Sequence, residues 1–244
     1  MIKCDQLSKK FYPSLFSKKE IFALQEISIE AIKGQTYALA GPNGSGKTTL
    51  LSCILGMYHP TSGSCSINNL HPQEAHSRIN MGYLPENFST YPDITPVEAI
   101  KHYALLSDKT IETSAVDEWL TKFDLFHERH RKIRGFSKGM IQRLGMVISL
   151  IHDPELIIWD EPSSGLDPEG RKLVLDLILE QKKKGKTIIV SSHILSDIER
   201  TCDHLWILKK GKLILDDNIH IACERANCKT VEELYLLKIQ AEHI

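Results

Sequence analysis

The sequence predicts an α/β fold in which helices cover both faces of a parallel β-sheet. Short apolar stretches at 36–40, 156–159 and 187–191 have the length and composition of buried strands. They alternate with segments of helical periodicity, which is typical of parallel sheets that are covered on both faces. A glycine-rich turn after the first strand, followed by a helix that begins at Lys47, supports the same prediction.

The first part of the chain predicts an additional antiparallel β-layer. Residues 2–7 form one strand-like stretch, and residues 21–32 form a second one in which apolar and polar residues alternate. A polar loop rich in Pro, Ser and Lys separates them at 13–19. We therefore expect these strands to form an antiparallel layer ahead of the parallel sheet.

The middle of the chain predicts a helical insert. Apolar residues recur there at three- and four-residue spacing in 97–106, 116–126 and 140–151. The tail contains an amphipathic helix at 231–239, and no internal repeat or low-complexity linker occurs. We expect a single domain over residues 1–244, with a helical subdomain at about 88–151 and a helical tail at about 218–244.

The composition disfavours a nucleic-acid-binding protein. Of the 244 residues, 42% are hydrophobic and 25% charged, as in an ordinary globular domain. The formal net charge of -1 argues against a broad basic surface, so we expect no nucleic-acid partner. One dense basic run surrounds Gly185 at an expected helix end. It comprises Lys182, Lys183, Lys184 and Lys186.

Neither a membrane span nor a metal cluster is predicted. No apolar run approaches the ~18 to 20 residues that a membrane-spanning helix needs, and no secretory signal begins the sequence. We therefore expect a cytoplasmic protein that reaches a membrane only through a partner. Six cysteines without a C-x-x-C pair and eleven histidines without ligand spacing indicate free thiols and no structural metal.

The strongest local signal is a glycine-rich phosphate-binding motif. It has the pattern G-x-x-x-x-G-K-[ST], and it follows a predicted strand and precedes a predicted helix. A glycine turn that merely closes a strand–helix unit is the structural alternative, which the full pattern in this context disfavours. The motif consists of Gly41, Pro42, Asn43, Gly44, Ser45, Gly46, Lys47 and Thr48.

These residue types suit the binding of ATP with Mg²⁺. Glycines let backbone N–H groups surround the phosphates, and the following helix points its positive end at the anion. Lys47 is expected to reach the β- and γ-phosphates. The Thr48 hydroxyl is expected to bind Mg²⁺, a cation that prefers oxygen ligands. ATP and Mg²⁺ are therefore the predicted cofactors.

Two carboxylates follow the strand predicted at 156–159. Asp160 and Glu161 would emerge at the carboxyl edge of the sheet, where open α/β sheets bind ligands. Asp160 is expected to hold Mg²⁺ through its waters, and Glu161 to position or deprotonate the attacking water. Alone, such a pair also fits ordinary solvation of a strand end. The phosphate-binding motif favours the catalytic interpretation.

Three further motifs complete an ordered set. Residues 136–140 read FSKGM and precede the carboxylate pair, residues 164–167 read SGLD and follow it, and His193 comes last. With the phosphate-binding motif, this order resembles the nucleotide-binding domains of ATP-binding cassette (ABC) transporters. The resemblance covers residues from about 2 to 217, and five motifs in one order make it specific.

The resemblance implies roles for residues around the nucleotide. Phe11, or its neighbour Tyr12, resembles the aromatic residue that stacks on adenine, and the phosphate-binding loop extends to Thr49. Glu86 stands where the family usually has the metal-ligating glutamine of the Q-loop. Without the resemblance, Phe11 and Tyr12 are ordinary core or surface aromatic residues.

The remaining motifs imply that two chains share each site. Ser137 and Gly139 correspond to the signature motif, which in the family contacts the γ-phosphate of ATP bound to the opposite subunit. Asp167 matches the D-loop, and His193 the switch histidine that contacts the γ-phosphate. Locally, Ser137 also fits a helix N-cap and His193 a loop histidine. The expected working unit is a homodimer, or this chain paired with a second ABC subunit.

Two departures from the family pattern bear on the direction of transport. The signature reads FSKGM instead of LSGGQ, and Glu86 replaces glutamine. The phosphate-contacting Ser137 and Gly139 are kept, whereas a glutamate at position 86 keeps a ligating oxygen and adds charge near Mg²⁺. Both variants resemble those of the exporter-type branch of bacterial ATPases, so we expect export.

The sequence therefore predicts the ATP-binding and ATP-hydrolysing subunit of an ABC transporter, acting through a separate transmembrane permease. The permease is expected to dock near residues 86–93, where Phe88, Tyr91 and Pro92 offer an apolar groove.

Two alternatives come from other classes of protein. A soluble ABC ATPase that acts on ribosomes or DNA usually has two cassettes or a long coiled-coil insertion, and neither is present. A P-loop kinase or GTPase leaves Ser137, Asp167 and His193 without a role.

Overall fold

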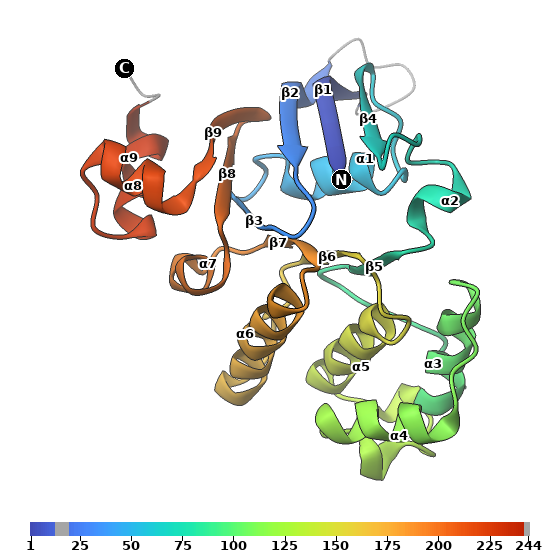
Figure 1. Cartoon of the computed structure of the whole chain (residues 1–244). Helices are drawn as coiled ribbons and strands as arrows, with labels where there is room; N and C mark the ends of the chain where they lie inside the picture. The colour runs from blue at the N-terminus through green and yellow to red at the C-terminus, as the bar shows by residue number, and fades with distance from the viewer. Residues whose placement is uncertain (13–19, 242–244) are drawn as a thin grey trace.

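The computed structural model describes residues 1–12 and 20–241, so the polar loop expected at 13–19 lies outside the described residues. Antiparallel strands form a three-stranded layer in the order β2-β1-β4 (Figure 1). They are β1 (Ile2–Phe11), β2 (Ile21–Ala31) and β4 (Ser62–Ile67). The expected antiparallel layer is confirmed. However, β1 is longer than predicted, and the sequence did not indicate β4, the third strand of the layer.

A six-stranded sheet forms the centre of the structure, in the order β5-β6-β7-β3-β8-β9. Its first five strands are parallel, whereas β9 pairs antiparallel with β8. The predicted strands at 36–40, 156–159 and 187–191 are confirmed as parallel neighbours, and β9 adds an antiparallel edge that the sequence did not indicate. The strands are β3 (Thr36–Ala40), β5 (Met81–Leu84), β6 (Leu156–Asp160), β7 (Thr187–Ser191), β8 (His204–Lys209) and β9 (Lys212–Asn218).

The turn between β8 and β9 explains why the hairpin forms. Lys210 and Gly211 both have positive φ, 48° and 77°, as a two-residue type I′ turn requires. Asn-Gly or Asp-Gly is the usual signal for such a turn. Lys-Gly lacks that signal, so the sequence did not reveal the hairpin.

The three helices expected in the middle of the chain are present on one side of the sheet (Figure 1). They are α3 (Pro96–Leu105), α4 (Thr113–Lys122) and α5 (Lys138–Leu150), with short 3-10 turns at Phe126–Glu128 and Ile133–Gly135. Helix α3 begins one residue earlier than its apolar pattern because Thr95 and Glu98 form a reciprocal capping box, with Pro96 in the first turn.

The other helices flank the sheet or complete the tail. Among them, α8 and α9 both lie in the helical tail expected at about 218–244, and α9 matches the amphipathic helix expected at 231–239 (Figure 1). They are α1 (Lys47–Ile54), α2 (Ala75–Arg78), α6 (Pro168–Lys183), α7 (Leu195–Thr201), α8 (Ile219–Ala226) and α9 (Val231–Ala241). No helix in the described part of the chain is long and apolar enough to cross a membrane.

Strand β6 shows how the core is divided. Ile157 and Trp159 lie in a cluster with the helices on one side of the sheet, whereas Leu156 and Ile158 lie in a second cluster with the antiparallel layer. Successive side chains of a strand point to opposite faces. The apolar run of β6 is continuous because both faces of the strand are buried. This burial holds in place the strand that ends at Asp160.

The basic run at the end of α6 takes part in ion pairs along the surface. Lys182 lies 2.6 Å from Asp203, Lys184 lies 2.9 Å from Glu180, and Lys186 lies 2.6 Å from Asp153. Gly185 has a φ of 73°, as expected just past a helix end. These three lysines therefore form ion pairs at the end of α6 and with the segments beside it. The six cysteines are free thiols.

Candidate functional site

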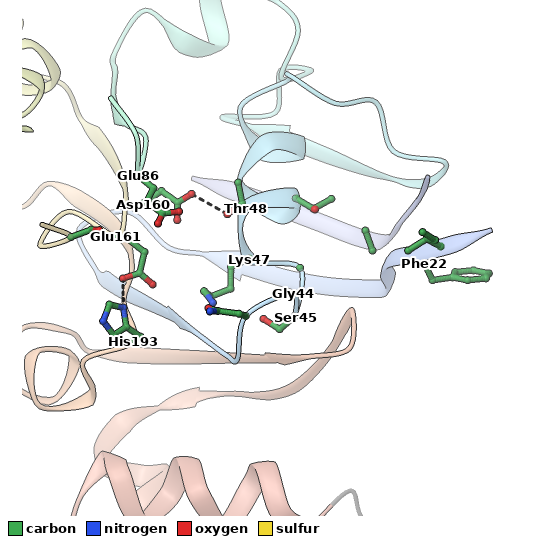
Figure 2. Close-up of a pocket in the computed structure, with 15 residues that line it drawn as sticks. Phe22, Gly44, Ser45, Lys47, Thr48, Glu86, Asp160, Glu161 and His193 are labelled. Carbon is green, nitrogen blue, oxygen red and sulfur yellow. Dashed lines mark hydrogen bonds and ion pairs between the residues drawn. The ribbon is translucent and has the colours of Figure 1, made fainter. Parts of the chain in front are cut away.

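The carboxyl ends of β3, β6 and β7 meet at one cavity of about 710 Å³ (Figure 2). The loop after β3, Glu86 two residues beyond β5, the loop after β7 and the start of β2 also line it. Most of the residues predicted around the phosphates and the metal ion line it. They are Asn43, Gly44, Ser45, Gly46, Lys47, Thr48, Thr49, Glu86, Asp160, Glu161 and His193.

At two positions of the phosphate-binding loop, the backbone conformation and the surrounding atoms leave room only for glycine. Gly41 has a φ of 149°, and a Cβ there would lie 2.2 Å from the carbonyl oxygen of Leu208. Gly46 has a φ of 109°, and a Cβ there would lie 2.6 Å from the carbonyl oxygen of Ala23. Because only glycine fits both the dihedral angle and the space, these residues fix the path of the loop into α1.

The polar groups of the loop fit an anion. The Nζ atom of Lys47 donates to the carbonyl oxygen of Gly41 at 2.7 Å and lies 3.4 Å from that of Pro42. The buried Oγ atom of Ser45 has no hydrogen-bond partner in the described part of the chain. An unpaired buried hydroxyl is costly. A cation and an unpaired donor beside the start of α1 therefore suit a phosphate group.

Asp160 is held from two sides. Its Oδ2 atom accepts a hydrogen bond from the Thr48 hydroxyl at 3.2 Å, and its Oδ1 atom accepts one from the Ser191 hydroxyl at 2.5 Å. Asp160 is buried at the end of β6. Burial, together with the negative charge of Asp160, raises the pKa of the neighbouring Tyr83 to about 12.

The oxygen donors in this corner fit a Mg²⁺ ion. The Thr48 hydroxyl and the Asp160 carboxylate are adjacent, and Glu86 lines the same cavity. The described residues contain no cluster of three or more His, Cys, Asp or Glu side chains able to hold a metal. Mg²⁺ with a nucleotide needs only one or two protein ligands, besides phosphate oxygens and waters, so this sparse donor set is appropriate.

Glu161 and His193 form a pair at one end of the cavity (Figure 2). The Nδ1 atom of His193 lies 2.7 Å from Oε2 of Glu161. Glu161 has a φ of 49°, which is uncommon for a residue that is not glycine, and such backbone strain often occurs at functional sites. Glu161 therefore presents its carboxylate to the cavity from a constrained backbone.

The aromatic residues predicted for adenine lie elsewhere. Phe11 packs edge-on against Tyr58, with ring centroids 5.4 Å apart, and the Tyr12 hydroxyl donates to Glu20 at 3.1 Å. Neither lines the cavity, whereas Phe22 does, at the end away from Glu161 and His193 (Figure 2). Phe22 was missed because it is only one of several apolar residues in the β2 pattern.

The predicted signature and D-loop residues lie at a second depression, of about 490 Å³. Ser137, Gly139 and Asp167 line it together with Arg143. Ser137 caps α5 by accepting from the Met140 N–H at 3.3 Å, and Asp167 caps α6 in the same way. Ser137 therefore has the helix-capping role that its local alternative indicated, and Ser137, Gly139 and Asp167 do not line the cavity beside the phosphate-binding loop within one chain.

Comparison with known proteins gives the family. A family model described as ABC transporter matches residues 24–164. An uncharacterised ABC transporter ATP-binding protein of Methanocaldococcus jannaschii is 37% identical over 226 residues, covering 92% of this chain and 80% of that protein. A lantibiotic transport ATP-binding protein of Streptococcus pyogenes is 33% identical over 235 residues, which cover 96% of each. The chain spans 62% of a longer relative from Synechocystis.

Solved structures agree with this family. An ATP-binding subunit of an ABC transporter has a TM-score of 0.87 at 28% identity, covering 98% of this chain and all of that one. A dimeric ATP-binding cassette bound to ADP and Pi shares the fold, with a TM-score of 0.82 at 22% identity over 89% of this chain and 98% of that one. The chain therefore belongs to the ABC transporter family, as one of its ATP-binding subunits.

Proposed function

We propose that the cavity beside the phosphate-binding loop hydrolyses ATP and thereby powers export through a separate membrane permease. The observation that carries the proposal is the meeting of three groups in one cavity. The Lys47 cation, the Thr48–Asp160 oxygen pair and the Glu161–His193 pair lie where ATP phosphates, Mg²⁺ and an attacking water are needed.

Each side chain has a separate task in this proposal. Lys47 binds the terminal phosphates, and Thr48 with Asp160 holds Mg²⁺, with Glu86 as a further oxygen donor. Mg²⁺ would neutralise the charge that develops on the phosphates. Glu161 accepts the proton of the attacking water, and His193 holds the Glu161 carboxylate in place.

The position of the signature residues supports a site shared between two chains. Ser137, Gly139 and Asp167 line their own depression and are exposed or half-buried there, so they remain available to a second chain. We propose that they contact the γ-phosphate bound by that chain. The second chain is either an identical copy or another ABC subunit.

Export and attachment to the cytoplasmic face of a membrane are also proposed. The Streptococcus pyogenes relative is described as a lantibiotic transport protein, and it aligns over 96% of both chains. The permease would dock near residues 86–93, where Tyr91 and Pro92 are exposed. Phe88, which the sequence placed in the same groove, instead packs partly buried against the main core.

Membrane sedimentation tests the proposed partner. The chain should sediment with membranes when the permease is co-expressed and stay in the supernatant otherwise. Tyr91→Ser should weaken this association, whereas Leu236→Ser, at a comparably exposed apolar position on α9, should leave it unchanged. Recovery with ribosomes, or equal loss in both variants, contradicts the proposed docking site.

Light scattering tests the shared site. The Glu161→Gln protein should become a dimer with Mg·ATP, because ATP that binds the dimer better shifts the equilibrium towards dimer. Adding Ser137→Arg should abolish this shift. A monomer under all conditions, or a dimer indifferent to Ser137, would point to a different partner chain.

A further inference from the structure

We infer that Ser191 is a positioning residue for ATP hydrolysis, because its hydroxyl holds both Asp160 and Glu161 in place. The inference rests on the proposed function of these two carboxylates. Ser191 is fully buried and is not among the residues that line the cavity, so it acts through its neighbours.

The register of the sheet places Ser191 beside Asp160. Ser191 ends β7, Asp160 ends β6, and the two residues are partners in the parallel ladder. Partner residues in neighbouring strands point to the same face of the sheet. The two side chains therefore meet because of strand pairing, and they require no loop rearrangement.

The hydrogen bonds of Ser191 have a defined direction. The backbone N–H of Glu161 donates to the Ser191 Oγ atom at 2.8 Å, and that oxygen is 2.5 Å from Asp160 Oδ1. A hydroxyl has one proton to donate and two lone pairs to accept with. The amide of Glu161 can only donate, so the Ser191 proton is left to point at Asp160. A hydroxyl that donates to a carboxylate forms a short, strong bond.

These bonds orient the Asp160 carboxylate. Oδ1 is occupied by Ser191, and Oδ2 faces the Thr48 hydroxyl at 3.2 Å. With both oxygens held, the carboxylate plane is fixed and Oδ2 stays beside the proposed Mg²⁺ position. A partner that orients a metal ligand in this way commonly affects metal affinity as well as rate.

The same hydroxyl anchors the backbone of Glu161. Glu161 has a φ of 49°, and its carboxylate extends from there to His193 at 2.7 Å. A residue in this conformation keeps it only where its surroundings hold it. The Ser191 oxygen provides one such contact at the amide, and His193 provides another at the carboxylate. Loss of the hydroxyl would remove one contact from each of the two carboxylate residues at once.

Three substitutions at position 191 separate positioning from packing. Ser191→Ala removes the hydroxyl, Ser191→Cys replaces it with a weak donor and acceptor, and Ser191→Thr keeps it on a side chain that suits a strand. Thr187→Val is the control. Thr187 is also buried in β7, and its hydroxyl accepts a hydrogen bond from the Gly34 N–H. Neither Thr187 nor Gly34 lines the cavity.

The chain of 244 residues is measured in two ways. Steady-state hydrolysis gives kcat and KM, and calorimetry gives the increase in ADP affinity on adding Mg²⁺. We expect Ser191→Ala to lower kcat and to reduce that Mg²⁺-dependent increase by about 10- to 100-fold, while ADP affinity without Mg²⁺ stays within about twofold. Ser191→Cys should be intermediate, and Ser191→Thr and Thr187→Val should resemble the parent protein.

Two results would overturn the inference. One is a folded Ser191→Ala protein whose Mg²⁺-dependent gain in ADP affinity equals that of the parent. The other is Ser191→Ala and Thr187→Val losing activity equally, in proportion to their stability. Glu161→Gln, measured in parallel, separates this from the proposed function. If Glu161→Gln is slow while Ser191→Ala is normal, only the role of Ser191 fails; a fully active Glu161→Gln removes the proposed role of Glu161.

Discussion

The Nδ1 atom of His193 lies 2.7 Å from Oε2 of Glu161, and the two side chains differ sharply in exposure. The Glu161 side chain is 13% exposed, whereas that of His193 is 69% exposed. The histidine therefore approaches the carboxylate from the open side of the cavity, where a bound nucleotide would also lie. This arrangement couples the orientation of the proposed base to the loop after β7.

Removing the imidazole should slow hydrolysis without preventing nucleotide binding. In His193→Ala, Glu161 keeps its backbone position but loses the contact that orients its carboxylate, so we expect kcat to fall by about 10²-fold. ATP affinity should change little, since Lys47 and the loop remain. Parallel losses in kcat and ATP affinity would instead assign His193 to nucleotide binding.

Lys47→Ala should abolish nucleotide binding. The ammonium group now contacts backbone carbonyl oxygens of the loop, and no other lysine or arginine lines this cavity in the described part of the chain. Equilibrium binding of a fluorescent ATP analogue measures the loss. Lys138→Ala serves as the control, because Lys138 lies at the separate signature depression. Full affinity in Lys47→Ala would contradict the phosphate-binding role of the loop.

Gly46→Ala should destabilise the fold more than Gly44→Ala. Both glycines have positive φ, so alanine at either position has a strained backbone, which lowers the free energy of unfolding by about 1 to 3 kcal/mol. Only Gly46→Ala adds a clash, because its Cβ would lie 2.6 Å from the Ala23 carbonyl oxygen, while nothing lies within 4 Å at Gly44. Urea unfolding gives the two free energies of unfolding. Equal losses would show that the loop relaxes around the clash.

His152 should make the folded state less stable in mild acid. Burial lowers its pKa below the ordinary value of 6.5, against weaker opposing effects such as its hydrogen bond to the Met81 carbonyl oxygen. The unfolded chain then binds more protons, so the stabilisation is complete above pH 6.5 and is lost as pH falls through the folded-state pKa.

The test compares urea midpoints at about pH 7.5 and about pH 5.5. His152→Gln cannot titrate but keeps a donor for the Met81 carbonyl oxygen. It should show a smaller drop in midpoint than the parent protein. An equal drop in both would assign the acid sensitivity to other groups.

Much of the fold was predictable because the decisive residues are local. Strand β3, the glycine-rich turn and α1 follow from adjacent apolar, glycine and helix-forming residues. The strands that escaped prediction depend on distant partners. Strand β5 has only four residues and is held by β6. In β4, serine and glycine occupy four of the six positions, which does not indicate a strand, and β4 is held by β1.

In the site, too, residues in local motifs were predicted, and residues that depend on distant partners were not. Lys47, Thr48, Asp160 and Glu161 were found because each lies in a short motif at a strand end. Ser191 was not found, since its role depends on the register between β6 and β7, which no local pattern encodes. Phe22 likewise reaches the cavity only because β2 passes over the loop at Gly46, where the Ala23 carbonyl oxygen approaches.

If this cavity hydrolyses ATP with Glu161 as the base, the Glu161→Gln protein should bind ATP and hydrolyse it slowly. Its affinity for Mg·ATP and its single-turnover rate of hydrolysis are measured beside the parent chain. The amide keeps the shape of the side chain but cannot accept the proton of water. We predict unchanged or tighter ATP binding and a rate lower by about 10² to 10⁴-fold. Hydrolysis at the parental rate with intact binding would contradict this role of Glu161.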